Sequence, residues 1–450
     1  MAFNFLVCDR DQEFLLPPSV REWLPEDHLA WFVVDAVGCI GLGGFYASYR
    51  EDGWGRAAFD PRMMVALLLY AYAVGERSSR RIERRCREDV AFRVITANRA
   101  PDHATIARFR VRHERELAEI FSQVLRLCAR AGLVSVGVVA VDGSLVAGDA
   151  SPRATRSYAS IRDEVEGMLA EAAEADARED AEFGDRRGDE LPAELADPGS
   201  RRARLRRALE EMEREQAAAE AAAQARYVAK LERRAAWEAE HGRRLSGRRP
   251  RPPVADALEK RKANATDPES RLMKRNGGRA VQGYNAQIVT TGGQVILAAG
   301  VTQAHTDTDQ LAAMVGAAAA TIRRAGIGEP IGVVVADGGY WNPDHIDTVT
   351  DDGIDVVIPP PKRWRAQGLE PAKTPHAQRM TRVLATPAGR ALYQRRQHMA
   401  EPVFAHTKYL RRCDRFMRRG LAACHAEWRL IAATHNLLKL WRASLAAQPE

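Results

Sequence analysis

The pattern of apolar and polar positions predicts helices in the first part of the chain. In FDPRMMVALLLYAYAVGE, Asp60 and Pro61 are the residue types of an N-cap and a first helical position before a long apolar run. Residues 79–95 have the pattern of one basic amphipathic helix. Residues 101–125 again repeat apolar positions at helical spacing, with arginines between them. The pattern therefore predicts an all-α N-terminal domain over residues 1–130.

Further along, short apolar runs ended by turns predict buried strands. The runs VGVVAVDGS and VVVADGGYW each end in Asp-Gly, which places Asp142 and Asp337 at the carboxyl ends of two strands. Residues 280–304 predict two strands joined by a hairpin turn, and residues 311–326 predict a helix. Open α/β sheets place their chemistry at the carboxyl ends of strands. A single strand followed by Asp-Gly is more often a turn cap, so the argument depends on the pair and on a third carboxylate.

The remaining segments are helical or irregular. Residues 160–262 are dominated by Ala, Glu and Arg, which predicts a helical arm built as a hairpin or as two long helices. Residues 359–387 are basic and contain prolines, which predicts irregular structure. Helical periodicity resumes at 388 and includes Pro402, which either kinks the helix or lies near its first turn.

Composition narrows the class of protein. The net charge of +7 over 450 residues, carried mostly by arginine, favours a polyanionic partner, although a charge of this size is only suggestive. The six cysteines form no CxxC pair, which argues against a zinc ribbon or a disulfide framework. The sequence has no signal peptide and no apolar window of ~18 residues. These features predict a cytoplasmic protein with no membrane association.

Several motifs together resemble those of insertion-sequence transposases of the DDE class. The catalytic motifs are VAVDGSLVAGDAS, DPESRLMKRNGG followed by VQGYNAQIV, VVADGGYW, and YQRRQHMAEPVFAHTKYLRR with a downstream AEWRLIAATHNLLKLW. The N-terminal FDPRMMVALLLYAYAVGERSSRRIE and DHATIARFR resemble the helical DNA-binding domain of that family. The resemblance implies an α/β ribonuclease-H-like catalytic core, interrupted by a long helical insertion and preceded by an all-α DNA-binding domain. The implied division is 1–130 for DNA binding, 131–152 and 266–445 for the core, and 153–265 for the inserted arm.

The resemblance also implies the site residues. Asp142, Asp337 and Glu401 match the catalytic, metal-binding carboxylates. The DNA-binding residues that accompany the glutamate are matched by Tyr393, Arg396 and Lys408. The spacing from the tyrosine and arginine to the glutamate is one residue longer than the family pattern, so Arg395 competes with Arg396. Ala405 replaces a common glycine, which has little consequence because neither residue is a ligand.

Carboxylates that converge on one site are hard oxygen ligands suited to Mg²⁺. Two such ions, about 4 Å apart, activate a water or a 3′-hydroxyl and stabilise the leaving oxygen of an in-line phosphoryl displacement. Mn²⁺ shares this ligand chemistry and is expected to substitute. We therefore expect two Mg²⁺ ions as cofactors.

Other polar residues have two open interpretations each. Arg108 and Arg110 lie in a basic helix that is either a recognition element or a solvated amphipathic helix. Lys274 and Arg275 flank Asn-Gly-Gly and either contact phosphates or belong to a solvated turn. Asp149, Asp307 and Asp309 are either additional ligands or, more often for such residues, loop caps. His406 either contacts DNA or is a surface histidine, and Trp237 either stacks on a base or packs within the arm.

The predicted function is DNA transposition. The enzyme is expected to nick transposon ends and to join the freed 3′-hydroxyl to target DNA. Because two ends must be brought together, a homodimer or higher oligomer is expected, associated with the nucleoid when active. The alternatives are a nuclease of the same fold without strand transfer, and a non-catalytic DNA-binding protein.

Overall fold

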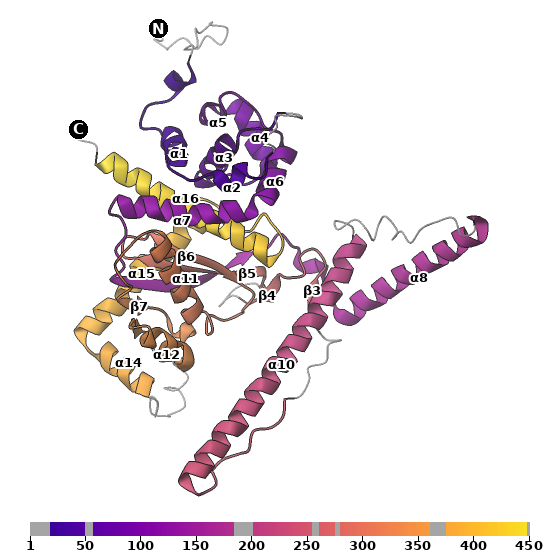
Figure 1. The fold of residues 1–450 in the computed structure, drawn as a ribbon, viewed down its shortest axis with the longest axis vertical. Helices are drawn as coiled ribbons and strands as arrows, with labels where there is room; N and C mark the ends of the chain where they lie inside the picture. The colour runs from indigo at the N-terminus through magenta and orange to yellow at the C-terminus, as the bar shows by residue number, and fades with distance from the viewer. Residues whose placement is uncertain are drawn as a thin grey trace, which may run out of the picture.

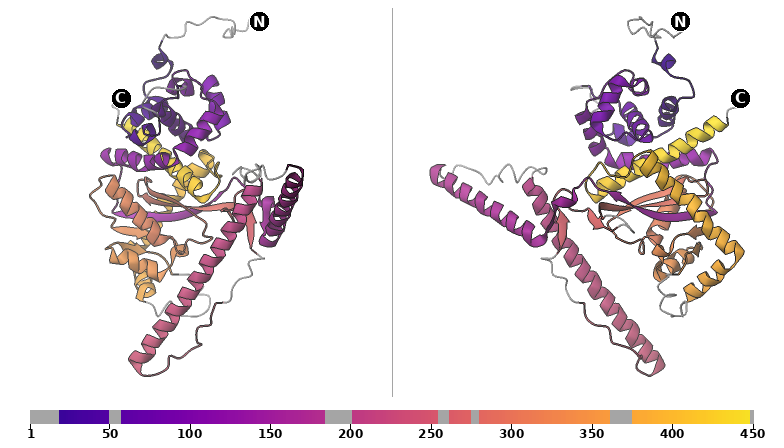
Figure 2. Two further views of the ribbon diagram at one scale, coloured as in Figure 1. Left: turned by 45° about the vertical axis from the view of Figure 1, so that its right-hand side comes forward. Right: turned by 180° about the vertical axis from the view of Figure 1, so that it is seen from behind.

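The computed structural model describes residues 19–49, 57–183, 201–253, 261–274, 280–360 and 375–447. Within these ranges the chain forms a helix-rich N-terminal region and a mixed sheet with helices against it. Two long helices project from one side (Figure 1). The views in Figure 2 show that this projection stands clear of the remaining elements on both sides of the molecule.

The N-terminal region is helical, as predicted. Asp60 caps the third helix by accepting from the backbone N–H of Arg62, and Pro61 takes the first helical position. The region consists of a short 3-10 turn and seven helices: Val20–Trp23, α1 (Leu29–Gly38), α2 (Gly43–Tyr46), α3 (Pro61–Ala73), α4 (Ser79–Glu88), α5 (Val90–Ile95), α6 (His103–Arg112) and α7 (Glu114–Arg130).

Two predicted single helices are each divided in two. The segment 79–95 breaks at Asp89, whose carboxylate accepts from the backbone N–H groups of Ala91 and Phe92 and so begins a new helix. The segment 101–125 breaks at His113, which ends α6 and precedes α7. An extended N-cap residue cannot continue the preceding helix, so the prediction of one helix from 79 to 95 is wrong.

A six-stranded mixed sheet forms the centre of the molecule. The strand order is β4-β5-β1-β7-β8, and β6 pairs with the outer edge of β5. Strand β1 is antiparallel to β5 and parallel to β7, which is parallel to β8. The predicted hairpin is confirmed by β5 and β6. The strands are β1 (Val138–Ala147), β4 (Arg271–Met273), β5 (Val281–Thr291), β6 (Ile296–Thr302), β7 (Val333–Val335) and β8 (Asp355–Val357).

Strand β1 is longer than predicted. It runs on to Ala147 because β5 pairs with it along its whole length, from Val139 opposite Thr291 to Ala147 opposite Gly283. Asp142 therefore lies inside a strand, and the prediction that it ends one is wrong. On the other edge β7 pairs with β1 only as far as Ala140. Asp142 is thus free of a strand partner on the β7 side only.

The later helices cover the sheet and connect it to the N-terminal region. They are α11 (Leu311–Arg324), α12 (Pro343–Asp351), α14 (Pro375–Ala385), α15 (Pro387–Ala405) and α16 (Leu421–Ala446). Helix α14 corrects the prediction of irregular structure at residues 375–385. Pro402 lies inside α15, which continues into a π-helical turn, His406–Leu410.

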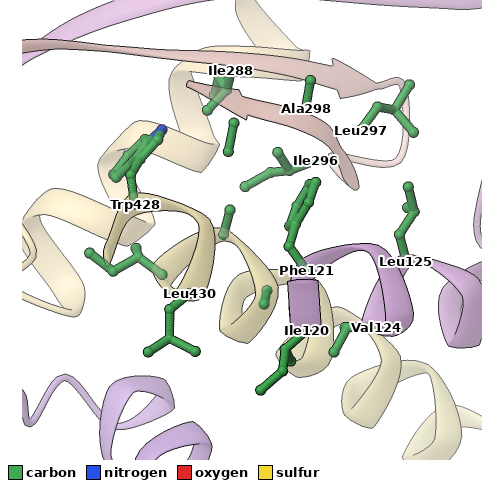
Figure 3. Packing of buried hydrophobic residues seen from close by; sticks show 14 of the residues in the cluster. Ile120, Phe121, Val124, Leu125, Ile288, Ile296, Leu297, Ala298, Trp428 and Leu430 are labelled. Carbon is green, nitrogen blue, oxygen red and sulfur yellow. The ribbon is translucent and has the colours of Figure 1, made fainter. Parts of the chain in front are cut away.

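One buried apolar core joins the N-terminal helices to the sheet. Phe121 on α7, Trp428 on α16 and Ile296 on β6 belong to the same cluster, and Figure 3 shows these side chains pointing toward one another between the helices and the strands. The core is therefore continuous across residue 130. The position of the sheet relative to the N-terminal helices is set by this shared packing.

The predicted helical arm consists of two long helices, α8 (Tyr158–Phe183) and α10 (Arg201–His241). They meet near the antiparallel pair β2 (Thr155–Ser157) and β3 (Lys262–Asn264) and diverge from there (Figure 1). Their contact has a small apolar cluster of its own, which includes Ile161, Leu205 and Met212. No described helix is long and apolar enough to cross a membrane.

Candidate functional site

The sheet places Asp142 and Asp337 side by side. The last paired residues of the parallel strands β1 and β7 are Ala140 and Val335. Each aspartate follows its paired residue by two positions, so the two residues lie at the same level along the neighbouring strands. Asp337 also caps the short turn that follows, because its Oδ1 accepts from the backbone N–H of Gly339 at 2.8 Å. Asp337 therefore caps the turn from a position that is level with Asp142.

Asp142 is largely buried among other charges. Its Oδ2 lies 3.2 Å from Nη1 of Arg396, and its Oδ1 accepts from the backbone N–H of Gly143 at 2.9 Å. Burial raises the pKa of Asp142 to about 6, the Arg396 guanidinium opposes that rise, and the charges of Asp337 and Asp307 add to it. Mutual repulsion among carboxylates is the arrangement that a bound cation relieves.

Asp307 is a third carboxylate of this group. Its Oδ1 accepts from the side-chain amides of Asn285 at 2.7 Å and Gln287 at 2.6 Å, both on β5. A Cβ at Gly143 would lie 2.7 Å from the same oxygen, so only a glycine leaves room for Asp307 beside Asp142. The favoured interpretation of Asp307 as a loop cap is therefore wrong. The amide residues Asn285 and Gln287, at alternate positions of β5, were the sequence signal that could have pointed to a polar partner such as Asp307.

Two other aspartates lie outside this group. Asp309 accepts from the side chain of Asn342 at 2.9 Å, and Asp149 pairs with Arg419 at 3.0 Å.

Glu401 is held apart from the aspartates by Arg396. The Nη2 of Arg396 lies 3.9 Å from Oε1 of Glu401, while its Nη1 contacts Asp142. The Glu401 side chain is 58% exposed, against 15% for Asp142. Among the described residues no group of three or more His, Cys, Asp or Glu side chains is close enough together to hold a metal ion. The structure thus brings the two predicted aspartates together and links Glu401 to them through a guanidinium.

The side chains of Asp142, Asp307 and Asp337 have the donor chemistry that a divalent cation needs, but in this structure they are not close enough together to hold one. All three side chains are hard oxygen donors, as Mg²⁺ and Mn²⁺ require. Burial is the main reason that the pKa of Asp142 is raised, and the charges of Asp337 and Asp307 add to the rise while the Arg396 guanidinium opposes it. A cation would hold these carboxylates in their ionised form.

The basic and aromatic partners of Glu401 are close to the same strand. Lys408 is buried and its Nζ donates to the hydroxyl of Ser144 and the carbonyl of Leu145, each at 2.8 Å. The Tyr393 ring lies 6.0 Å from the guanidinium carbon of Arg396. Residues far apart in the sequence are therefore gathered around β1.

The predicted DNA contacts outside this group differ in accessibility. Arg108 is exposed on α6, and its side chain donates a long hydrogen bond, 3.4 Å, to the hydroxyl of Thr105. Arg110 is half-buried and donates to the hydroxyl of Tyr72 at 3.2 Å and to the carbonyl of Arg77 at 2.8 Å. Lys274 is exposed after β4, and Arg275 lies outside the described residues.

The two single rings are both engaged within the chain. His406 is half-buried, and its Nδ1 lies 3.2 Å from Nδ1 of His435. His435 in turn donates from Nε2 to the carbonyl of Gln294, at 3.0 Å. Burial lowers the pKa of His406 to about 4. Trp237 stacks on His241 within the arm, with ring centroids 4.1 Å apart.

Comparison with known families covers both parts of the chain. Residues 18–112 match the model of a transposase domain, DUF772. Residues 259–437, which hold Asp307, Asp337, Arg396 and Glu401, match the model of a transposase DDE domain. No curated protein and no solved structure matches the chain.

Proposed function

The chain is a DDE transposase of the insertion-sequence type, and from that premise we propose how its residues act on DNA. The enzyme cleaves DNA at transposon ends and joins the freed 3′-hydroxyl to target DNA, with Asp142 and Asp337 at the reacting phosphate. The observation that carries this proposal is the position of these two aspartates, each two residues beyond the last residue pair of β1 and β7.

The proposed catalytic core is ribonuclease-H-like. Across the sheet, β5 is antiparallel to both β6 and β1, and β7 and β8 then lie parallel to β1. This arrangement supports the assignment. In this proposal residues 131–152 and 266–445 form the core, and residues 153–265 are an insertion. Strands β2 and β3 pair with each other at the base of the arm, so the chain leaves the core and returns to it at one place. This pairing supports the assignment of the arm as an insertion. Residues 1–130 are proposed to contact DNA.

We propose that Glu401 completes the carboxylate set when DNA binds. Arg396 contacts both Asp142 and Glu401, so its guanidinium now supplies the positive charge between them. A DNA phosphate is a better bidentate partner for arginine than a carboxylate shared with a second acid. Movement of Arg396 onto the phosphate would free Asp142 and Glu401. Tyr393 would orient that guanidinium, and Lys408 would hold the Ser144–Leu145 backbone beside the DNA.

The proposed metal ligands are Asp142, Asp337 and Glu401, with Asp307 beside them. The family requires divalent metal, and hard oxygen donors favour two Mg²⁺ ions, with Mn²⁺ as a substitute. Ions held by these residues would supply activation of the attacking oxygen and charge stabilisation of the leaving oxygen. Asp142 and Asp337 hold their positions through the sheet, whereas Glu401 depends on α15. We further propose a homodimer or higher oligomer, because two transposon ends must be joined in one reaction.

Cleavage of a labelled duplex that carries an end of the element tests the proposal. Wild-type protein is incubated with Mg²⁺ or Mn²⁺ beside Asp337→Ala and a matched control, Asp351→Ala, at the exposed end of α12. Metal-dependent nicking by wild type and control but not by Asp337→Ala, with DNA binding retained in all three, is the expected result. Equal nicking by all three proteins would reject Asp337 as a catalytic residue.

A supplied acceptor duplex separates transposition from hydrolysis. Joined products of higher mass are expected from wild type, and nicked ends without joined products would favour the nuclease alternative. If DNA is bound but never nicked, and Asp142→Ala changes nothing, the protein is a DNA-binding protein without catalysis.

A further inference from the structure

A cavity of about 380 Å³ lies between the turn that joins α3 to α4 and the segment that follows the π-helical turn. Its walls come from the N-terminal region on one side, with Gly75 and Arg81, and from residues 410–412 and Met417 on the other. It is separate from the carboxylate group around Asp142. It also lies between two parts of the chain that are more than 300 residues apart in sequence.

The lining is strongly basic. Among the described lining residues, Glu76 is the only acidic one. Five arginines line the cavity: Arg77, Arg81, Arg85, Arg411 and Arg412. Glu76 is shared between Arg81, at 3.2 Å, and Arg85, at 3.8 Å. The charge of Arg77 is compensated by Glu427, at 3.2 Å. The positive charge of Arg411 and Arg412 is left without a carboxylate in contact among the described residues.

Arg411 is the most informative residue of this lining. It is only 4% exposed, and it donates to the carbonyls of Tyr72 and Ile431 and to the hydroxyl of Thr434. Its Nε has no hydrogen-bond partner among the described residues. A buried cation is normally paired with an anion, because neutral acceptors recover only part of its lost hydration. The arrangement therefore lacks an anion.

Large apolar side chains are exposed to solvent at and beside the rim of the cavity. Tyr409 is 77% exposed and Leu410 is 79% exposed, both on the π-helical turn, and Met417 is 41% exposed. Exposed apolar side chains beside clustered arginines suit a ligand that has a charged backbone and flat or apolar groups. A free inorganic anion would use the arginines only.

The rim is continuous with the catalytic strand. Lys408, on the same π-helical turn, contacts Ser144 and Leu145 of β1. The backbone at 414–416 pairs with Ala147 at the end of that strand. Ala147 is five residues from Asp142 along β1, which is ~17 Å at the usual rise per residue. A duplex that runs from Asp142 along β1 therefore passes Ala147 within half of its ~34 Å helical turn, beside the segment that leads from the π-helical turn to the cavity residue Met417.

We propose that this cavity binds a backbone phosphate of the DNA, with Arg411 and Arg412 as its cationic donors and Leu410 and Met417 against the adjoining sugars. The inference rests on the proposed function, because it takes DNA at Asp142 as given. The contact would fix the register of the duplex relative to the carboxylates. It also explains why the N-terminal helices and the sheet share one core: both halves of the phosphate site must keep a constant distance.

Binding of a transposon-end duplex is measured against salt concentration for wild type, Arg412→Ala and Arg81→Ala. The matched control is Arg84→Ala, because Arg84 is exposed on the same helix as Arg81 and does not line the cavity. Arg412→Ala should bind roughly tenfold more weakly and lower the slope of log K against log salt by ~1. Arg81→Ala should have a smaller effect, because the Arg81 guanidinium already contacts Glu76. Arg84→Ala should leave both quantities unchanged. Thermal unfolding of each variant verifies its folding.

Phosphate-ethylation interference then locates the contact. Ethylation at one phosphate near the cleavage site should block binding by wild type and cease to matter for Arg412→Ala. Equal slopes for all four proteins, with the same interference pattern, would overturn the proposal while leaving the proposed function intact. Failure of wild type to bind any end duplex would overturn both.

Inorganic phosphate at matched ionic strength provides the remaining arm. If it raises the unfolding temperature of wild type but not of Arg412→Ala, while DNA binding is the same for both, the cavity is a site for a free anion and the DNA proposal is overturned.

Discussion

At the scale of single residues, the environment of Asp142 explains why one guanidinium matters. Its carboxylate is buried beside two others, and its pKa is raised to about 6 even with Arg396 in contact. The Arg396 guanidinium therefore favours the ionised form of the Asp142 carboxylate, which burial alone would shift toward the protonated form. The residue matched in sequence as a DNA contact acts, in this structure, as an internal counter-ion.

Asp307 provides the first residue-scale prediction. Asp307→Asn keeps the shape of the side chain but removes one of the charges that act on Asp142, so metal-dependent nicking should fall about 10- to 100-fold. Asp309→Asn, two residues away and bonded to Asn342 instead, is the matched control. Initial nicking rates at several Mn²⁺ concentrations measure the effect. Equal rates for the two variants would remove Asp307 from the site.

The His406–His435 pair predicts sensitivity to acid. Burial lowers the pKa of His435 to about 3, below its usual value near 6.5. The folded state therefore resists a proton that the unfolded chain accepts, and the stability that depends on a neutral His435 is lost as pH falls from about 6.5 toward 3.

His435→Gln retains a donor for the Gln294 carbonyl without a titrating ring. Between pH 7 and pH 4 the free energy of unfolding of wild type should fall by about 3 kcal/mol more than that of the variant. Chemical denaturation at the two pH values tests this. Parallel pH profiles would mean that folding does not lower the pKa of His435.

At the scale of elements, one buried ion pair ties the N-terminal helices to α16. Arg77, in the turn after α3, lies 3.2 Å from Glu427 and also donates to the carbonyl of Arg412 at 2.8 Å. Glu427 accepts in addition from the backbone N–H groups of Met417 and Arg418. Both side chains of the pair are almost fully buried.

Removing one partner of this pair should be costly. Glu427→Gln leaves Arg77 buried without its counter-ion, and the free energy of unfolding should fall by about 3–5 kcal/mol. The exposed pair Arg84–Glu88 on α4 provides the control, since Glu88→Gln should not change stability measurably. Urea denaturation compares the two variants. Similar midpoints for both would show that the buried pair does not hold the helices together.

The breaks in the N-terminal helices also belong to this scale. Helical periodicity continues through Asp89 and His113, so periodicity alone gives no boundary there. The boundary at Asp89 is decided by a competition in which its carboxylate satisfies two N–H groups of a new helix. Asp60 before proline is unambiguous by contrast, because the ring of Pro61 excludes a preceding helical turn.

At the scale of the whole molecule, the arm is separable in its packing. Its apolar cluster is distinct from the main core, and the chain enters and leaves it through the pairing of Ser157 with Lys262. Replacing residues 158–261 by Asn-Gly would join β2 and β3 through a two-residue hairpin turn, which suits this sequence.

We expect this shortened protein to fold. Its unfolding should remain one cooperative transition with a midpoint within about 5 °C of wild type, because none of the described residues between 158 and 261 belongs to the main apolar core. Calorimetry of both proteins, with metal-dependent nicking of short duplexes as a check of the site, provides the test. Loss of cooperative unfolding would show that the arm supports the core.

The sequence alone determined the classes of element, the pair of aspartates and the long helices of the arm, because these depend on local periodicity, strand-ending turns and helix propensity. It also carried the family motifs. Asp337 was placed correctly after its strand, since β7 is short and ended by glycines.

Only the tertiary structure decided what depends on contacts between distant segments. Strand β1 runs past Asp142 because β5 pairs with it, Asp307 joins the site because β5 supplies two amides, and Arg396 rather than a neighbour reaches Asp142. The basic cavity arises where the α3–α4 turn meets residues 410–417, and each half alone has the sequence of an ordinary solvated turn. Long-range pairing and burial set these features, and neither is encoded in the spacing of a single segment.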